Sequence, residues 1–150
     1  MMKIFLCSLV VGLSMACSMS FTKETNSLVS LLKSYDKRIP NSECVYILRS
    51  NLSCKGCVQR MFYQIDSIAD EGFKIPMVVL ATSIKDVPPQ LLDKITFVED
   101  VKNEVMTQFI WSVNLTLIRT KEGEVIEFKV IETTDPSIYP KEVADFFQTE

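Results

Sequence analysis

Cys54 and Cys57, separated by Lys55 and Gly56, are the residues with the clearest potential for chemistry. Such a pair can exchange disulfides, bind a soft metal ion or form a structural disulfide. A β-like run over residues 44–48 precedes the pair, and a run with helical spacing follows it. Cys54 is therefore expected at the amino terminus of a helix, where unpaired N–H groups and the helix dipole stabilise a thiolate. Lys55 would add a positive field, and Cys57, one turn later, could close a disulfide with Cys54.

Composition excludes several other kinds of site. The chain has 150 residues, no histidine and a formal charge of −3. Without histidine there can be no Ser–His or Cys–His nucleophile pair and no zinc site that needs imidazole. An acidic chain without a basic stripe is a poor partner for nucleic acid, because nothing neutralises the phosphates. The length and the hydrophobic content predict one globular domain.

The amino-terminal residues 1–16 have the features of an export signal. Lys3 precedes an apolar run over residues 4–13 that is too short for a permanent membrane span, and small residues follow at Ser14 and Ala16. We therefore expect an exported protein in which this segment is a signal peptide, residues 17–41 are a tether with a helix, and residues 42–150 are the folded domain.

Residues 13–17, LSMAC, resemble the lipobox of bacterial lipoproteins, in which the cysteine becomes the lipidated first residue. Cys17 would then carry several acyl chains, which together anchor a protein firmly to a membrane. Conventional cleavage after Ala16 is the alternative. Either way, the expected location is the bacterial cell envelope, and lipidation would leave the domain facing the periplasm.

The remaining sequence predicts alternating helices and strands. Helical spacing or helix-start signals occur over residues 23–39, from Cys54 to a stop signal at Gly72, after Pro88 and Pro89, after Asp100 with Val101 and Val105 on one face, and from Pro140 onward. Strand patterns occur over residues 44–48, 74–82, 95–98, 109–119 and 124–131, with a turn over residues 120–123. Strand–helix–strand units and a terminal hairpin predict a mixed sheet with helices on both faces.

The strand VYILR, the motif CKGC and the amphipathic helix after it resemble the first half of the thioredoxin superfamily fold. The run VNLTLIRTKEGEVIEF, residues 113–128, resembles the terminal hairpin of that superfamily. The resemblance is greatest to membrane-tethered extracytoplasmic thioredoxins of the cytochrome-maturation or peroxiredoxin-like type. It implies an α/β three-layer sandwich with a mixed central sheet, helices on both faces and a C-terminal β-hairpin plus helix. It also implies that Cys54 is the attacking thiol and Cys57 the resolving thiol.

The resemblance also indicates which residues surround the dithiol. Members of the superfamily place a cis-proline opposite it, and alignment on Gly123 puts that position at Asn114 or Leu115, so a trans peptide bond is expected there. Ser53 stands where relatives usually carry an aromatic residue. Lys55 and Gly56 complete the predicted supporting set.

Trp111, Arg49 and Cys44 lie outside this predicted supporting set. Trp111 is interpreted as a core residue that could also help to wall the site. Some thioredoxins keep a buried acid beneath the resolving cysteine, but here the strand offers Leu48 and Arg49, and the latter is interpreted as an exposed arginine at a strand end. Cys44 is interpreted as a small buried hydrophobic residue, with a role as a third redox thiol as the alternative.

The main hypothesis is an extracytoplasmic thiol–disulfide oxidoreductase that exchanges disulfides with exported proteins and works with a membrane redox partner. It requires no cofactor and no metal. One alternative is a non-catalytic thioredoxin-fold interaction module with a structural disulfide. Another is a Cu(I)-binding protein, because LSCKGC resembles the MxCxxC loop of heavy-metal-associated domains with Leu52 in place of methionine. The direction of the redox reaction is not decided by the sequence.

Overall fold

The computed structural model describes residues 20–109, 115–131, 137 and 139–148. The expected signal peptide, Cys17, Trp111 and Asn114 lie outside the described residues. The elements follow one another as α1 (Thr22–Lys33), β1 (Cys44–Arg49), α2 (Lys55–Asp70), β2 (Met77–Ala81), the 3₁₀ helix η1 (Ile84–Asp86), α3 (Pro89–Leu92), β3 (Thr96–Glu99), α4 (Glu104–Gln108), β4 (Leu115–Lys121), β5 (Glu124–Ile131) and α5 (Tyr139–Gln148). The predicted order of helices and strands is confirmed.

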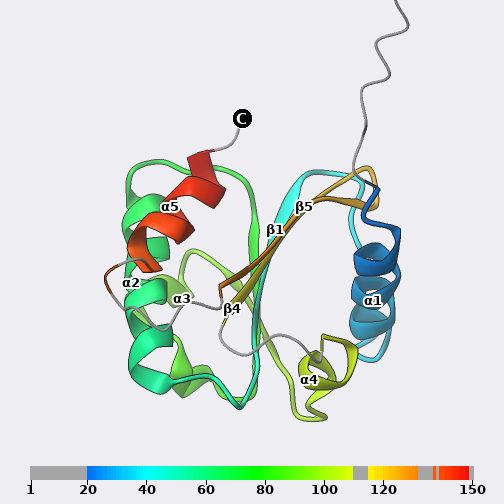
Figure 1. Ribbon diagram of the computed structural model, residues 1–150, viewed down its shortest axis with the longest axis horizontal. Helices are drawn as coiled ribbons and strands as arrows, with labels where there is room; N and C mark the ends of the chain where they lie inside the picture. Colours follow the sequence, from blue (N-terminus) through cyan, green and yellow to red (C-terminus); the bar gives the residue numbers. More distant parts are fainter. Residues whose placement is uncertain (1–19, 110–114, 132–136, 138, 149–150) are drawn as a thin grey trace, which may run out of the picture.

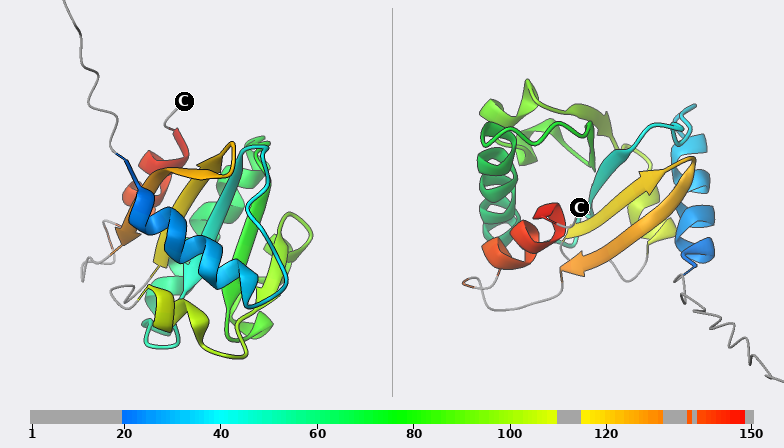
Figure 2. Two further views of the ribbon diagram at one scale, coloured as in Figure 1. Left: turned by 90° about the vertical axis from the view of Figure 1, so that its right-hand side faces the viewer. Right: turned by 90° about the horizontal axis from the view of Figure 1, so that it is seen from above.

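The strands form one mixed sheet in the order β3-β2-β1-β4-β5. β1, β2 and β3 are parallel, whereas β4 runs antiparallel to β1 and forms a hairpin with β5. Figures 1 and 2 show α2, α3 and α5 on one face of the sheet and α1 and α4 on the other. Figure 2 shows the sheet between these two helical layers. The α/β sandwich with a mixed central sheet, a C-terminal hairpin and a closing helix is therefore confirmed.

Alternate side chains of β1 enter two separate cores. Val45 and Ile47 pack under α2 and α5 in a cluster that we call the α2 core, which also contains Val58, Met61, Phe62, Ile65, Leu115, Leu117, Val143 and Phe146. Cys44, Tyr46 and Leu48 pack under α1 and α4 in the α1 core, which also contains Leu28, Leu31, Leu32, Val105, Phe109 and Ile118. Since both faces of β1 are covered, every residue of this strand is buried. The position of a side chain along β1 therefore decides which core it enters.

Two helices end at residues with positive φ. α1 is shorter than predicted: Asp36 adopts a φ of 55°, and the Lys37 N–H donates to the Leu32 carbonyl at 2.9 Å, which closes the helix before Pro40. α2 ends as predicted, with Gly72 at a φ of 102° and the Phe73 N–H donating to the Ile68 carbonyl. Glycine tolerates this left-handed conformation without a steric penalty.

The structure corrects the predicted segment after β3. Asp100 is buried, and its carboxylate accepts hydrogen bonds from the N–H groups of Glu104 and Val105, which delays the start of α4. Val105 is buried, but Val101 precedes the helix and is 68% exposed, so the prediction that the two valines share one helical face is wrong.

The predicted hairpin is confirmed with different limits. Phe109 is the C-cap of α4 rather than a strand residue, and β4 begins at Leu115. The turn contains only Glu122 and Gly123, which have φ values of 54° and 82°, as in a type I′ turn. No helix in the described part of the chain is long and apolar enough to span a membrane.

Candidate dithiol site

The dithiol lies where the central strand passes into α2. β1 ends at Arg49, a short loop follows, and Cys54 is the N-cap of α2. The Val58 N–H donates to the Cys54 carbonyl at 3.0 Å, which is the first hydrogen bond of the helix. The structure thus places Cys54 at a helix amino terminus, as the sequence predicted.

The two sulfur atoms are within hydrogen-bonding distance. The Sγ of Cys57 donates to the Sγ of Cys54 at 2.7 Å, and both cysteines are free thiols. Cys54 is exposed, whereas Cys57 is half-buried and packs against the α2 core. The Cys54 sulfur is therefore accessible to a large reactant, whereas the Cys57 sulfur is partly covered by the α2 core.

The environment lowers the pKa of the Cys54 thiol. The largest cause is the hydrogen bond from the Cys57 thiol, followed by the backbone N–H of Cys57; desolvation opposes them, and the backbone N–H of Gly56 contributes least. Each of these donors favours the thiolate over the thiol. Lys55 is exposed next to Cys54. Its added positive field stays a prediction.

The described residues of the predicted supporting set lie in the loop before α2, in its first turn and on β4. Ser53 is buried; its N–H donates to the Ser50 carbonyl at 3.2 Å, and the hydroxyls of Ser50 and Ser53 are 3.5 Å apart. These contacts fold the loop tightly just before Cys54. Gly56 is exposed and faces open space, and Leu115 is buried opposite Arg49 in the β1–β4 pairing.

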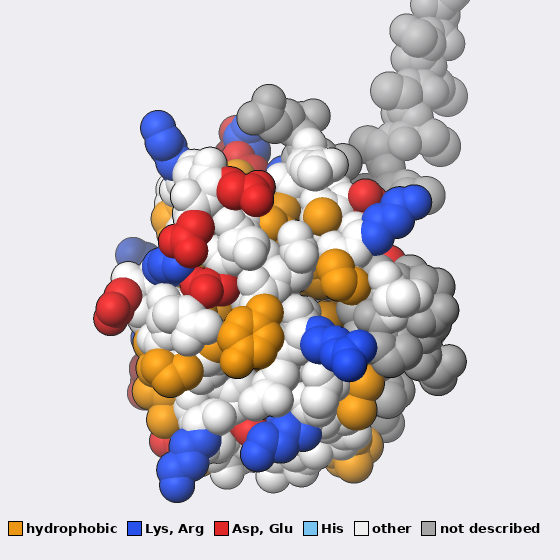
Figure 3. All heavy atoms as spheres, turned by 90° about the vertical axis from the view of Figure 1, so that its left-hand side faces the viewer, with side chains coloured by type: hydrophobic (Ala, Val, Ile, Leu, Met, Phe, Trp, Pro, Cys, Tyr) orange, Lys and Arg blue, Asp and Glu red, His pale blue; other side chains and the backbone are white. Residues whose placement is uncertain are grey.

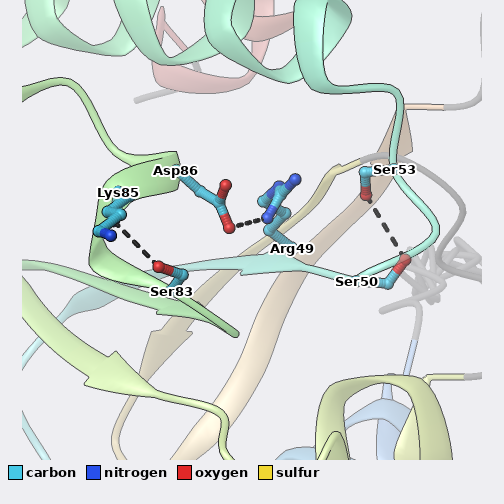
Figure 4. A network of polar contacts seen from close by, with 6 residues as sticks. All are labelled: Arg49, Ser50, Ser53, Ser83, Lys85 and Asp86. Carbon is cyan, nitrogen blue, oxygen red and sulfur yellow. Dashed lines mark hydrogen bonds and ion pairs between the residues drawn. The ribbon is translucent and has the colours of Figure 1, made fainter.

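The interpretation of Arg49 as an exposed residue is wrong. Its side chain is only 7% exposed and forms an ion pair with Asp86 of η1 (Figure 4). Arg49 follows Val45 and Ile47 on the α2 side of the sheet, so the pleat of β1 turns it inward. This buried ion pair was missed because Asp86 lies 37 positions away in the sequence. The alternation along residues 45, 47 and 49 was the available signal.

Cys44 is buried, as expected of a small hydrophobic residue. It lies in the α1 core with an exposure of 3%, and burial raises the pKa of its thiol. Within the described ranges, no group of three or more His, Cys, Asp or Glu residues could hold a metal ion.

The outer face of α2 and α5 carries side chains of several kinds. Figure 3 shows charged side chains of both signs on this face, with hydrophobic ones scattered among them. Tyr63 of α2 is among the exposed hydrophobic residues of the protein. The described side chains of this face form no single patch of one kind.

The strand order and the place of the dithiol decide the fold. β1 is central, α2 follows it directly, β2 returns parallel to it, and an antiparallel hairpin and a helix close the chain. The fold is thioredoxin-like. The cysteine pair of this thioredoxin-like chain occupies the start of the helix after the central strand.

Comparison of the sequence with protein-family models and with curated proteins finds no match. Solved structures with a similar fold include a secreted Mycobacterium tuberculosis disulfide oxidoreductase homologous to E. coli DsbE, with 7% identity, a TM-score of 0.41, and coverage of 70% of this chain and 82% of that one. Reduced Prx3 of Vibrio vulnificus in complex with H₂O₂ has 7% identity, a TM-score of 0.45 and coverage of 79% and 86%. A thioredoxin-like protein of Parabacteroides distasonis has 9% identity, a TM-score of 0.42 and coverage of 73% and 82%.

Proposed function

We propose that this protein is a thiol–disulfide oxidoreductase in which Cys54 attacks and Cys57 resolves. One observation carries the proposal: the exposed Cys54 sulfur, at the amino terminus of α2, accepts a hydrogen bond from the Cys57 sulfur at 2.7 Å. The thiolate is the nucleophile in disulfide exchange, and hydrogen bonds to it favour its formation. Cys57 is close enough to close the pair once Cys54 has reacted.

The exchange has two steps. The Cys54 thiolate attacks one sulfur of a client disulfide; that S–S bond breaks, a Cys54–client bond forms, and the other client sulfur leaves as a thiolate that takes up a proton. The Cys57 thiol then loses its proton and attacks the Cys54 sulfur, which forms the Cys54–Cys57 disulfide and releases the second client thiolate. Two electrons pass from the protein to the client, and the reverse sequence oxidises a client dithiol.

Insulin reduction with a small-molecule dithiol as electron source tests this function. Wild-type protein should accelerate the reaction, and Cys54→Ser should remove the acceleration. Cys57→Ser should retain the attack and accumulate a mixed disulfide that is visible without reductant. Cys44→Ser is the matched control, because it removes a buried thiol on the other face of the sheet, and its rate should equal that of wild type.

Two results would contradict the enzymatic function. Equal rates for wild type and Cys54→Ser would favour a non-catalytic interaction module. Stoichiometric Cu(I) binding with a thiolate charge-transfer band, combined with no insulin reduction, would favour metal binding by the same two sulfurs.

We also propose that the protein acts outside the cytosol, tethered to a membrane through Cys17. The positively charged start, the short apolar run and the LSMAC sequence support this location. Disulfides persist in such compartments, so exported proteins are the expected clients. A membrane redox partner would restore the Cys54–Cys57 pair after each turnover.

A further inference from the structure

Arg49 is a buried charge on the same side of the sheet as the dithiol helix. In the β1–β4 pairing Ile47 lies opposite Leu117 and Arg49 opposite Leu115, and these apolar residues all belong to the α2 core. The neighbouring Leu48 belongs to the α1 core. Arg49 thus continues the row of β1 side chains that face α2.

The guanidinium of Arg49 is only partly compensated. Its Nη1 donates to Asp86 Oδ2, and the two side chains are 7% and 16% exposed. Its Nε is buried and has no hydrogen-bond partner among the described residues. A buried donor without a partner is costly, so this N–H group is available to a negative charge that forms nearby.

A four-residue connection, residues 50–53, leads from Arg49 at the end of β1 to Cys54 at the start of α2. Arg49 stands five positions before Cys54, and the Ser50–Ser53 hydrogen bond folds the loop back on itself. Figure 4 shows the Arg49 side chain directed from β1 toward the α2 ribbon, between Asp86 and Ser53. Cys57 packs on the same α2 core, whereas Cys54 is exposed. Cys57 is therefore the sulfur on the Arg49 side.

We propose that Arg49, positioned by Asp86, stabilises the negative charge that develops on Cys57 when the dithiol exchanges. This proposal rests on the function proposed above. During resolution the Cys57 S–H bond releases its proton to solvent, and its electron pair forms the bond to the Cys54 sulfur. The positive charge of Arg49 favours the Cys57 thiolate. Asp86 limits this effect because its carboxylate offsets part of the guanidinium charge. Arg49 acts through Cys57 and is a positioning residue.

The proposal predicts that two single variants shift the Cys54–Cys57 dithiol–disulfide equilibrium in opposite directions. The full chain is equilibrated with glutathione redox buffers at fixed pH, and the Cys54–Cys57 disulfide is quantified by differential alkylation and peptide mass spectrometry. Arg49→Met removes the positive charge and leaves the Asp86 carboxylate without its partner, which disfavours the thiolate, so the pair should become more reducing. Asp86→Asn leaves Arg49 uncompensated, so the pair should become more oxidising. We expect each equilibrium constant to change about tenfold, which is about 30 mV for this two-electron couple.

Arg119→Met is the matched control. Arg119 is equally buried and lies opposite Val45, at the other end of the same face, where it donates to the Phe146 carbonyl at 2.8 Å. Its loss removes a similar buried charge four strand positions farther from the loop, so its equilibrium constant should stay within about twofold of wild type.

The double variant Arg49→Met with Asp86→Leu keeps the test decisive if a single variant does not fold, because replacing both members of a buried ion pair by apolar residues is often tolerated. Its equilibrium constant should lie between the values expected for the two single variants, on the reducing side of wild type. Shifts of the same sign in both single variants, a double variant identical to wild type, or an equal shift in Arg119→Met would overturn the proposal. The equilibrium needs only that the disulfide forms, so a wild type that fails in insulin reduction contradicts the proposed function and leaves this measurement intact.

Discussion

Cys44 and Cys57 lie on opposite faces of the central sheet. Cys44 belongs to the α1 core beneath α1, whereas Cys57 packs against the α2 core at the start of the dithiol helix. β1 and its neighbouring strands stand between the two sulfurs. The third thiol is therefore separated from the Cys54–Cys57 pair while the protein is folded.

This separation predicts a single disulfide on oxidation. Treatment of the native protein with glutathione disulfide should give Cys54–Cys57 and leave Cys44 as a thiol, measured by alkylation and peptide mass spectrometry. Cys54 should react fastest with iodoacetamide in the native protein because it is exposed, and Cys44 slowest because it is buried. In urea the difference should disappear. Native reaction of Cys44 at the rate of Cys54 would contradict the assignment.

The lowered pKa of Cys54 predicts the pH dependence of its alkylation. The rate follows the thiolate fraction, so its midpoint should lie at lower pH in the native protein than in urea. With a folded-state pKa below the unfolded one, the thiolate stabilises the fold above the unfolded pKa, and this contribution is lost as pH falls through the folded pKa. A native midpoint equal to that in urea would show that the environment of Cys54 has no effect.

The hydrogen bond from Cys57 is the largest cause of that lowering, and two substitutions separate it from the others. Cys57→Ala removes the donor and should move the alkylation midpoint of Cys54 upward. Cys57→Ser keeps a hydroxyl donor and should stay closer to wild type. If neither variant moves the midpoint, the backbone N–H groups rather than the side chain determine the pKa.

Asp100→Ala should lower the free energy of unfolding by about 2 kcal/mol or more. The buried Asp100 carboxylate accepts from the N–H groups of Glu104 and Val105 and from the Tyr35 hydroxyl, so its loss leaves three donors without their acceptor. Urea denaturation measures the change. The exposed Asp93 is the control, since Asp93→Ala should change stability by less than about 0.5 kcal/mol.

The hairpin turn predicts one stabilising and one destabilising substitution. Glu122 has a φ of 54°, a conformation that asparagine adopts more readily, so Glu122→Asn should stabilise the protein by about 0.5 kcal/mol. The backbone hydrogen bond from residue 122 to the Asn41 carbonyl is retained. Gly123→Ala should destabilise it by about 1 kcal/mol, because φ is 82° there. Thermal denaturation of both variants compares the two signs.

The proposed lipidation of Cys17 predicts incorporation of labelled palmitate in a bacterial host. Cys17→Ser should abolish the label and release the protein from the membrane fraction, because the acyl chains supply the anchor. Cys7→Ser, within the expected signal peptide, should keep both properties. A labelled Cys17→Ser variant would contradict the anchor, and an unlabelled wild type cleaved after Ala16 would favour conventional processing.

Local patterns were sufficient to predict most of the fold. The 3.6-residue spacing after Cys54 and the stop signal at Gly72 predicted α2. The apolar run around Val79 predicted β2. The limits that were wrong depend on contacts outside the segment. Val101 is exposed because Asp100 binds the N–H groups that begin α4. Phe109 ends that helix in the α1 core instead of starting a strand.

The sequence by itself determined the order of the elements and the position of Cys54 at a helix start, because both depend on residues that are neighbours along the chain. Only the tertiary structure decided that Arg49 is buried against Asp86 and that Cys44 lies away from the dithiol. These relationships depend on which way the pleat of β1 turns each side chain and on which distant segments cover its two faces. Such contacts form between residues far apart in the sequence, where no local pattern specifies the partner.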